Sequence, residues 1–99
     1  MFELYFLPAA LKEWQGLDAA VKDQFRRKLE KLLAAPRVSS MQLSGYRDCY
    51  RVKARKAGYR LIYHVSDRRV TVTVIRVARR DKDEAYARLL ERMAQLDSP

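Results

Sequence analysis

The stretch CYRVKARKAGYRLIYHV, residues 49–65, decides the fold, because apolar and polar residues alternate on both sides of a central turn. This period of two predicts a pair of antiparallel β-strands, one over residues 49–55 and one over residues 59–66. One face of the first strand is almost entirely cationic, and Arg60 follows just across the turn. The cationic residues of that face are Arg51, Lys53 and Arg55. Like charges side by side cost free energy, so an anion is expected to bind there.

Upstream of this hairpin, the sequence predicts one short strand and two helices. Residues 2–7 are rich in aromatic residues and are typical of a strand, and Pro8 suits the first turn of a helix. Asp18 is placed to cap a second helix, whose apolar residues recur at helical spacing until Pro36 ends it. Together these segments form an N-terminal helical hairpin with an apolar stripe that needs a sheet to cover it.

Downstream of the hairpin, residues 70–78 are rich in β-branched residues and predict a further strand. Helical spacing returns from Asp81 onward, where Ala85, Leu89 and Met93 recur four residues apart. The predicted order is therefore β-α-α-β-β-β-α. The fold class is α+β, with a small curved, mainly antiparallel four-stranded sheet, an N-terminal helical hairpin and a C-terminal helix in a single domain, residues 1–99. If the helices cover one face of the sheet, the cationic face stays open to water.

The positive charge is concentrated in the middle of the chain. The formal net charge is +9, and residues 47–80 contain eleven Lys or Arg but only two acids, Asp48 and Asp67. This segment therefore carries the whole excess, because the remainder of the chain is balanced. The alternative is that the charge only keeps the protein soluble, but evenly spread charge would do that equally well. A concentrated basic surface instead favours a polyanionic partner such as nucleic acid or an acidic protein.

Several classes of function are disfavoured by what the chain lacks. A single cysteine, Cys49, allows no internal disulfide, and the residues offer no metal-ligand set, so neither a metal nor a cofactor is expected. There is one histidine, His64, and no nucleotide-binding or metalloprotease motif. No apolar run approaches the ~20 residues that span a membrane, and the start does not resemble a signal peptide. A cytoplasmic location without membrane contact is therefore expected.

Clustered Arg and Lys with nearby tyrosines suit phosphate chemistry. RNA cleavage needs no outside nucleophile, because the ribose 2′-OH can attack the neighbouring phosphorus. The site must take the hydroxyl proton, stabilise an anionic phosphorane and protonate the departing 5′-oxygen. Arginine and lysine stabilise such an anion well, and a lysine crowded by cations has a lowered pKa and could act as a base. Arginine stays charged, which makes it a poor proton donor.

Four segments together resemble the RelE family of toxin ribonucleases. They are ALKEWQGLD (10–18), LEKLLAAPR (29–37), DCYRVKARKAGYRLIYHV (48–65) and VIRVARRDKDEAYARLL (74–90). The ALKEW and GYRL…Y pieces are weak signals alone, but the order and spacing of the segments make a strong combined signal that covers nearly the whole chain. The resemblance implies a metal-independent endoribonuclease that enters the ribosomal A site and cuts mRNA, inhibiting translation. It also implies a cognate RelB-like antitoxin that either neutralises the basic face or displaces the C-terminal helix.

Matched position by position, the resemblance implies a catalytic set and a supporting set. Lys53 is expected to be the general base or an electrostatic anchor, and Arg60 to hold the scissile phosphate. Arg80 would stabilise or protonate the leaving oxygen, and Tyr86 would orient the 2′-OH or stack on a base. The residues expected to bind RNA phosphate are Arg51, Arg55, Lys56 and Arg79. Arg51 departs from the family, which often has lysine there, so it should bind phosphate without acting as a base.

Two alternatives remain open at this stage. A gyrase-inhibiting toxin of the related ParE branch would share the fold without cutting RNA, and that branch generally lacks the set of Lys53, Arg60, Arg80 and Tyr86. A non-enzymatic RNA-binding module would explain the charge but not the family pattern.

Overall fold

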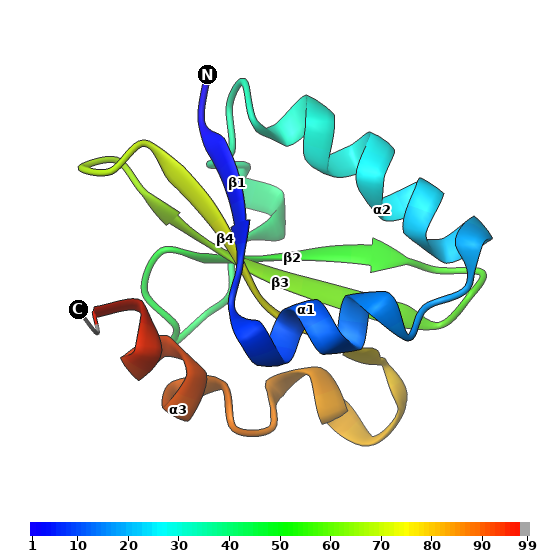
Figure 1. Ribbon diagram of the computed structural model, residues 1–99. Helices are drawn as coiled ribbons and strands as arrows, with labels where there is room; N and C mark the ends of the chain where they lie inside the picture. Colours follow the sequence, from blue (N-terminus) through cyan, green and yellow to red (C-terminus); the bar gives the residue numbers. More distant parts are fainter. Residues whose placement is uncertain (98–99) are drawn as a thin grey trace.

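The computed structural model describes residues 1–97, apart from the side chains at positions 82, 83 and 97, as a mixed four-stranded sheet between helical layers (Figure 1). The strands and α-helices are β1 (Glu3–Phe6), α1 (Pro8–Gln15), α2 (Ala19–Leu32), β2 (Cys49–Ala54), β3 (Tyr59–Ser66), β4 (Thr71–Arg79) and α3 (Leu89–Ala94). Three short 3₁₀ segments are η1 (Ser39–Met41), η2 (Asp81–Tyr86) and η3 (Gln95–Asp97). The predicted element order and the α+β class are confirmed. None of the helices described is long and apolar enough to cross a membrane.

The sheet has the strand order β1-β4-β3-β2. β1 runs parallel to β4, whereas β2, β3 and β4 form an antiparallel meander, so the sheet is mainly antiparallel as predicted. In the β2–β3 register, Lys53 lies opposite Arg60, and Cys49 lies opposite His64 near the other end of the pair. Residues directly opposite in an antiparallel pair point to the same face. Lys53 and Arg60 therefore project together from one end of the sheet.

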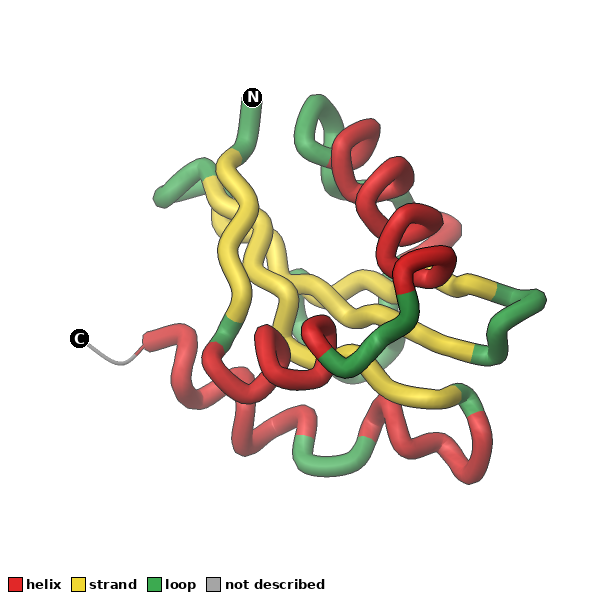
Figure 2. Tube along the Cα trace, turned by 45° about the vertical axis from the view of Figure 1, so that its right-hand side comes forward, coloured by secondary structure: helices red, strands yellow, loops and turns green. Residues whose placement is uncertain are grey.

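Helix α2 covers one face of the sheet (Figures 1 and 2). The Asp18 side chain caps its start by accepting a hydrogen bond from the Val21 amide at 3.0 Å, as the sequence predicts. The buried side chains of α2 are Val21, Phe25, Leu29 and Leu32, and they meet a face that includes Tyr50, Val52, Ala54, Leu61, Tyr63 and Val65. At the centre of this face, the Tyr63 hydroxyl donates to the Pro36 carbonyl at 2.7 Å, which satisfies the polar end of a fully buried side chain.

The opposite face is only partly open, which differs from the prediction that helices cover one side alone. Ile62 pairs with Arg51 and so faces the cationic side, yet its side chain is fully buried. The C-terminal segment covers it, since Ala85 and Leu89 are buried in the same core. Cys49 also belongs to this face, and its sulfur lies 3.9 Å from that of Met93 in α3. The C-terminal segment therefore covers the Cys49 end of the face and leaves the Lys53 end exposed.

The C-terminal segment is not the continuous helix that its periodicity predicts. It consists of η2, a break at Arg88, which has a left-handed backbone with φ 58°, and the short α3. The residue at the N-cap of η2 is Arg80 and not the predicted Asp81, and the Arg80 side chain makes no capping hydrogen bond. A short helix without a cap is marginal by itself, so tertiary contacts determine the path of this segment.

An ion-paired cluster joins the C-terminal segment to the rest of the fold. Both oxygens of Glu13 in α1 accept hydrogen bonds from Arg92 of α3, at 2.6 and 2.9 Å. Glu13 also lies 3.4 Å from Arg76 and accepts from the Val77 amide at 3.0 Å, while Arg92 donates to the Ile75 carbonyl at 3.0 Å. These groups are largely buried, so their hydrogen bonds are well shielded from water. We call Glu13, Arg76 and Arg92 the Glu13 clasp.

Breaking the Glu13 clasp is expected to expose Cys49. Burial, and then the charge of Asp48, raise the pKa of the Cys49 thiol to about 12, so the wild-type thiol should react slowly with a disulfide reagent at neutral pH. A charge-assisted hydrogen bond contributes about 1.5–3 kcal/mol, and about 1.4 kcal/mol is a factor of ten. Glu13→Gln should therefore accelerate labelling of Cys49 about 10–100-fold. The rate is measured by quenching the reaction at successive times and quantifying the labelled protein by mass spectrometry.

The matched control is Asp23→Asn, which removes a carboxylate from the exposed Asp23–Arg26 pair on α2. Its labelling rate should equal that of the wild type. Equal rates in the wild type and Glu13→Gln would show that the clasp does not hold α3 over the sheet.

Candidate active site

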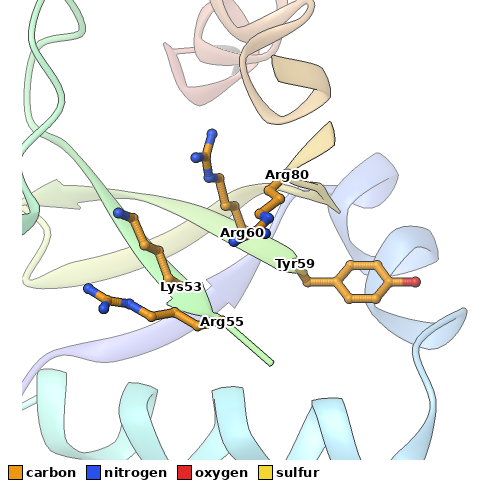
Figure 3. Close-up of a pocket in the computed structure, with 5 residues that line it drawn as sticks. All are labelled: Lys53, Arg55, Tyr59, Arg60 and Arg80. Atoms are coloured by element: carbon orange, nitrogen blue, oxygen red, sulfur yellow. The ribbon is translucent and has the colours of Figure 1, made fainter. Parts of the chain in front are cut away.

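The exposed end of the cationic face forms a cavity of about 290 Å³. It is lined by Lys53, Arg55, Tyr59, Arg60 and Arg80 (Figure 3). The Tyr59 ring points away from the cationic side chains in this view. The predicted convergence of Lys53, Arg60 and Arg80 on one water-facing cavity is therefore present, although these residues come from three different strands or their ends.

The β2–β3 turn places Arg80 beside Arg60. Gly58 has φ 72°, a conformation that side-chain-bearing residues rarely adopt, and its amide closes the turn on the Ala54 carbonyl at 3.0 Å. The Gly58 carbonyl in turn accepts a hydrogen bond from the Arg80 amide at 2.9 Å. The backbone of the turn thus ties the end of β4 to the start of β3. This contact fixes the Arg80 backbone at the cavity independently of its side chain.

Tyr86 lies between two of the cationic side chains. Its hydroxyl accepts a hydrogen bond from Arg51, and the Arg60 guanidinium carbon lies 5.7 Å from the centre of its ring. A guanidinium over an aromatic ring is attracted by the ring's negative face. Tyr86 belongs to η2, so the C-terminal segment that covers the Cys49 end of the sheet also contacts the cationic side chains.

The crowding of cations changes the acidity of Lys53. Its pKa lies below the ordinary lysine value; the charge of Arg51 is the largest cause, followed by loss of water and by the charges of Arg55, Arg60 and Arg80. A lowered pKa increases the fraction of neutral amine at a given pH. Lys53 is therefore the side chain in this cavity best suited to accept a proton.

The two acids of the basic segment do not neutralise this cavity. Arg37 forms ion pairs with both Asp48 and Asp67, each at 2.9 Å. Asp48 directly precedes Cys49 and Asp67 follows the end of β3, which places both at the other end of the hairpin from Lys53. The cavity therefore keeps its positive potential, because the two acidic side chains of the basic segment lie far from it.

The remaining predicted residues are placed differently. Arg55 lines the cavity, and Lys56 is exposed in the β2–β3 turn. Arg79 instead lies over the Tyr59 ring, with its guanidinium carbon 5.5 Å from the ring centre, and 3.7 Å from Asp81. Arg79 pairs with Tyr59 in the sheet and so belongs to the opposite face from Arg60. His64 lies at the far end of the face, beside α3, away from the cationic cavity.

Sequence reasoning missed residues that reach the site from elsewhere in the chain. Lys28 of α2 donates a hydrogen bond to the Lys53 carbonyl, and it lines a second cavity beside the first. Its position at the border of the apolar stripe of α2 is the available signal. The Glu13 clasp gave no comparable signal, because its members are dispersed along the chain. Among the residues described, no three His, Cys, Asp or Glu side chains lie close enough to hold a metal ion.

This arrangement can stabilise an anion that carries more charge than a phosphodiester. Guanidinium groups donate several fixed hydrogen bonds to phosphate oxygens and remain protonated. A preorganised set of such donors favours the more highly charged transition state over the ground state. With a lysine of lowered pKa beside them, the side chains provide both an electrostatic and a proton-accepting function.

Comparison with known proteins gives consistent matches over most of the chain. The family described as "ParE toxin of type II toxin-antitoxin system" matches residues 4–84. The mRNA interferase toxin RelE of Escherichia coli K12 is 42% identical over an alignment of 92 residues, which covers 90% of this chain and 97% of the relative. The free structure of a double arginine-to-alanine mutant of E. coli RelE superimposes with a TM-score of 0.86 at 40% identity, covering 93% of this chain and 97% of that one. The matched chain in the crystal structure of the intact E. coli RelBE toxin–antitoxin complex superimposes with a TM-score of 0.80 at 41% identity. The match covers 83% of this chain and 100% of that one.

Proposed function

This chain belongs to the RelE branch of the RelE/ParE superfamily of type II toxins, and from that membership we propose that it is a toxin that inhibits translation by cleaving mRNA. The observation that carries the proposal is the convergence of Lys53, Arg60 and Arg80 on one cavity, with the Tyr86 ring against Arg60. The relatives named as mRNA interferases support the same reaction.

The proposed reaction is an internal transfer at phosphorus. The ribose 2′-oxygen forms a bond to the adjacent phosphorus and the bond to the 5′-oxygen breaks, which leaves a 2′,3′-cyclic phosphate and a 5′-hydroxyl. The proton of the 2′-OH passes to a base, and the departing 5′-oxygen receives a proton from an acid or from water. No water is consumed in this step, and the chemistry described uses no metal ion.

The side chains take distinct roles in this proposal. Lys53 accepts the 2′-OH proton or, if it stays charged, anchors the phosphate. Arg60 holds the scissile phosphate, and Arg80 stabilises the phosphorane and the charge on the leaving oxygen. Tyr86 orients the 2′-OH or stacks on a base, and its hydrogen bond from Arg51 fixes its ring. The supporting phosphate contacts are assigned to Arg51, Arg55 and Lys56, with a lesser one for Arg79.

Cleavage is expected to depend on the ribosome. The site offers one lysine of lowered pKa and no carboxylate or histidine beside it among the residues described, so it must gain much of its rate from positioning. Holding a reactive group in the correct geometry can contribute a factor of about 10⁵ or more. Primer extension should therefore reveal strong cleavage of a translated message and little cleavage of the same message without ribosomes. Equal cleavage of the two would refute the dependence.

Inhibition of gyrase is the second candidate function, because the chain matches the ParE family model and a toxin of that branch would inhibit gyrase. A DNA supercoiling assay run with the same protein separates the two. Inhibited supercoiling without new mRNA ends would favour the gyrase function, whereas RNA binding without either effect would identify a non-enzymatic RNA-binding module.

The proposed partners follow from the same membership. The E. coli RelBE complex pairs the related toxin with its antitoxin, and we infer a RelB-like antitoxin for this chain. The ribosome and mRNA are the targets, which places the proposed action in the cytoplasm. The antitoxin would have to neutralise the cationic face or displace the C-terminal segment that carries Tyr86.

A further inference from the structure

A second cavity, of about 280 Å³, lies beside the first along the edge of β2. It is lined by Lys28, Ser40, Met41, Arg51, Lys53 and Arg55. We propose that this cavity is a second phosphate subsite, which holds an RNA phosphate outside the scissile link. The inference rests on the proposed function, and it identifies how the protein grips the strand on one side of the cleavage point.

Lys28 reaches this cavity from the helix that covers the other face of the sheet. It borders the buried stripe of α2, and its ammonium group donates to the backbone carbonyl of Lys53 at the edge of β2. An ammonium group has three N–H donors, so two remain for a ligand. The hydrogen bond to Lys53 holds the charge at the sheet edge and reduces the side-chain entropy that binding would cost.

Two further polar side chains line the same cavity. The Ser40 hydroxyl, in η1, can donate to a phosphate oxygen. Arg51 adds a guanidinium group to this lining, and its fixed positive charge attracts phosphate. No carboxylate lines either cavity in the described part of the chain.

The two cavities share Lys53 and Arg55 as a common wall. An RNA strand whose scissile phosphate lies in the first cavity must continue beyond it, and the second cavity provides cations along that continuation. This continuity favours an RNA phosphate over the carboxylates of an acidic protein. The phosphate could belong to the mRNA itself or to ribosomal RNA, since the recognition chemistry is the same.

The test compares Lys28→Gln with Lys22→Gln. Lys22 lies on the opposite border of the apolar stripe of α2 and lines neither cavity, so its change removes the same charge without touching the subsite. Binding of a hexaribonucleotide, with a 2′-deoxy residue at the cleavage position, is measured by fluorescence anisotropy between about 0.05 and 0.3 M salt, over which the Debye length falls from roughly 14 to roughly 6 Å.

One lost phosphate contact lowers the slope of log affinity against log salt by about 0.7 for single-stranded RNA, which is about fivefold in affinity at about 0.1 M salt. Lys28→Gln should show this loss, Lys22→Gln should match the wild type, and Lys28→Arg should restore the slope because it keeps the charge. The rescue separates loss of phosphate binding from a folding defect.

Parallel arms identify the source of the phosphate and the outcomes that overturn the proposal. A loss of affinity for the hexanucleotide assigns the subsite to the mRNA strand, and a loss confined to ribosomes without mRNA assigns it to ribosomal RNA. If Lys28→Gln matches Lys22→Gln in both arms while the wild type binds RNA, the subsite is refuted and the proposed function stands. If Lys28→Gln weakens only the binding of the antitoxin, the phosphate subsite is also refuted. If the wild type shows no salt-dependent binding in either arm, both proposals fail.

Discussion

Arg80→Ala is expected to lower the rate of mRNA cleavage by about 10²–10³-fold, because removing one preorganised donor to a developing oxyanion has effects of that size. Arg80 lines the cavity with Lys53 and Arg60 and is exposed. An exposed arginine contributes little to stability, and the backbone hydrogen bond from Arg80 to Gly58 does not involve its side chain. The thermal midpoint should therefore stay within about 2 °C of the wild type, about the shift that a few tenths of a kcal/mol produce.

The matched control for Arg80→Ala is Arg47→Ala, which removes an exposed arginine of the same basic segment at the other end of β2. Both variants lose one positive charge, but only Arg80 lies at the cavity. Single-turnover cleavage of a message bound to stalled ribosomes is the measurement. The cleavage rate of Arg79→Ala should lie between the rates of these two variants, since Arg79 lies over Tyr59 on the opposite face. A folded Arg80→Ala variant that retains wild-type cleavage would remove Arg80 from the site.

The parts of the fold that follow from local chemistry were predicted from the sequence. The alternation of β2 and β3 fixes both their pairing and their faces, because a shift of one residue would bury Arg51 and Lys53. The Asp18 cap depends only on neighbours three residues away, and it is present as expected. Such features need no knowledge of distant segments.

The C-terminal segment could not be predicted in the same way, because distant residues determine its path. Periodicity alone favoured one continuous helix, whereas the Glu13 clasp and the burial of Leu89 hold a broken segment against the second face. Those contacts join residues nearly eighty positions apart in the chain. The sequence shows that Glu13 and Arg92 are present, but nothing local indicates that they meet.

The site shows the same division. Placing Lys53 beside Arg60 follows from strand parity and the short turn, so the centre of the cavity was predictable. Bringing Tyr86 to Arg51 depends on the path of the C-terminal segment, and only the family resemblance indicated that residue. Lys28 was missed because a lysine beside an apolar helical stripe is usually a solvated flank. Its contact with the Lys53 carbonyl requires the packing of α2 on the sheet.

The cationic face also explains how the domain tolerates repulsion at its own site. Repulsion among Arg51, Lys53 and Arg60 destabilises the folded state, while the apolar core on the α2 side contains no buried charge among the residues described. The stabilising ion pairs, such as Arg37 with Asp48 and Asp67, lie away from the cavity. Stability and anion binding are therefore supplied by separate parts of the sheet, as expected where function opposes stability.

The second large effect is expected at Lys53, in the dependence of cleavage on pH. A base must be neutral to accept the 2′-OH proton, so below the pKa of Lys53 the single-turnover rate should rise about tenfold per pH unit and level off above it. Because neighbouring cations lower this pKa, the midpoint should lie below that of an ordinary lysine. Lys53→Arg keeps the charge but cannot lose its proton in this range. It should reduce the rate about 10²–10⁴-fold and abolish the rise with pH.

Arg51→Gln tests the cause of the shift. Arg51 is the largest contributor to the lowered pKa of Lys53, so its removal should raise that pKa and move the midpoint of the pH–rate curve to higher pH. Arg47→Gln removes an equal charge far from Lys53 and should leave the midpoint unchanged. The midpoint distinguishes this effect from the loss of the Arg51–Tyr86 hydrogen bond, which would lower the plateau without displacing the curve. If Lys53→Arg cleaves at the wild-type rate with the same pH dependence, Lys53 acts only as an electrostatic anchor and the proton must pass to another acceptor.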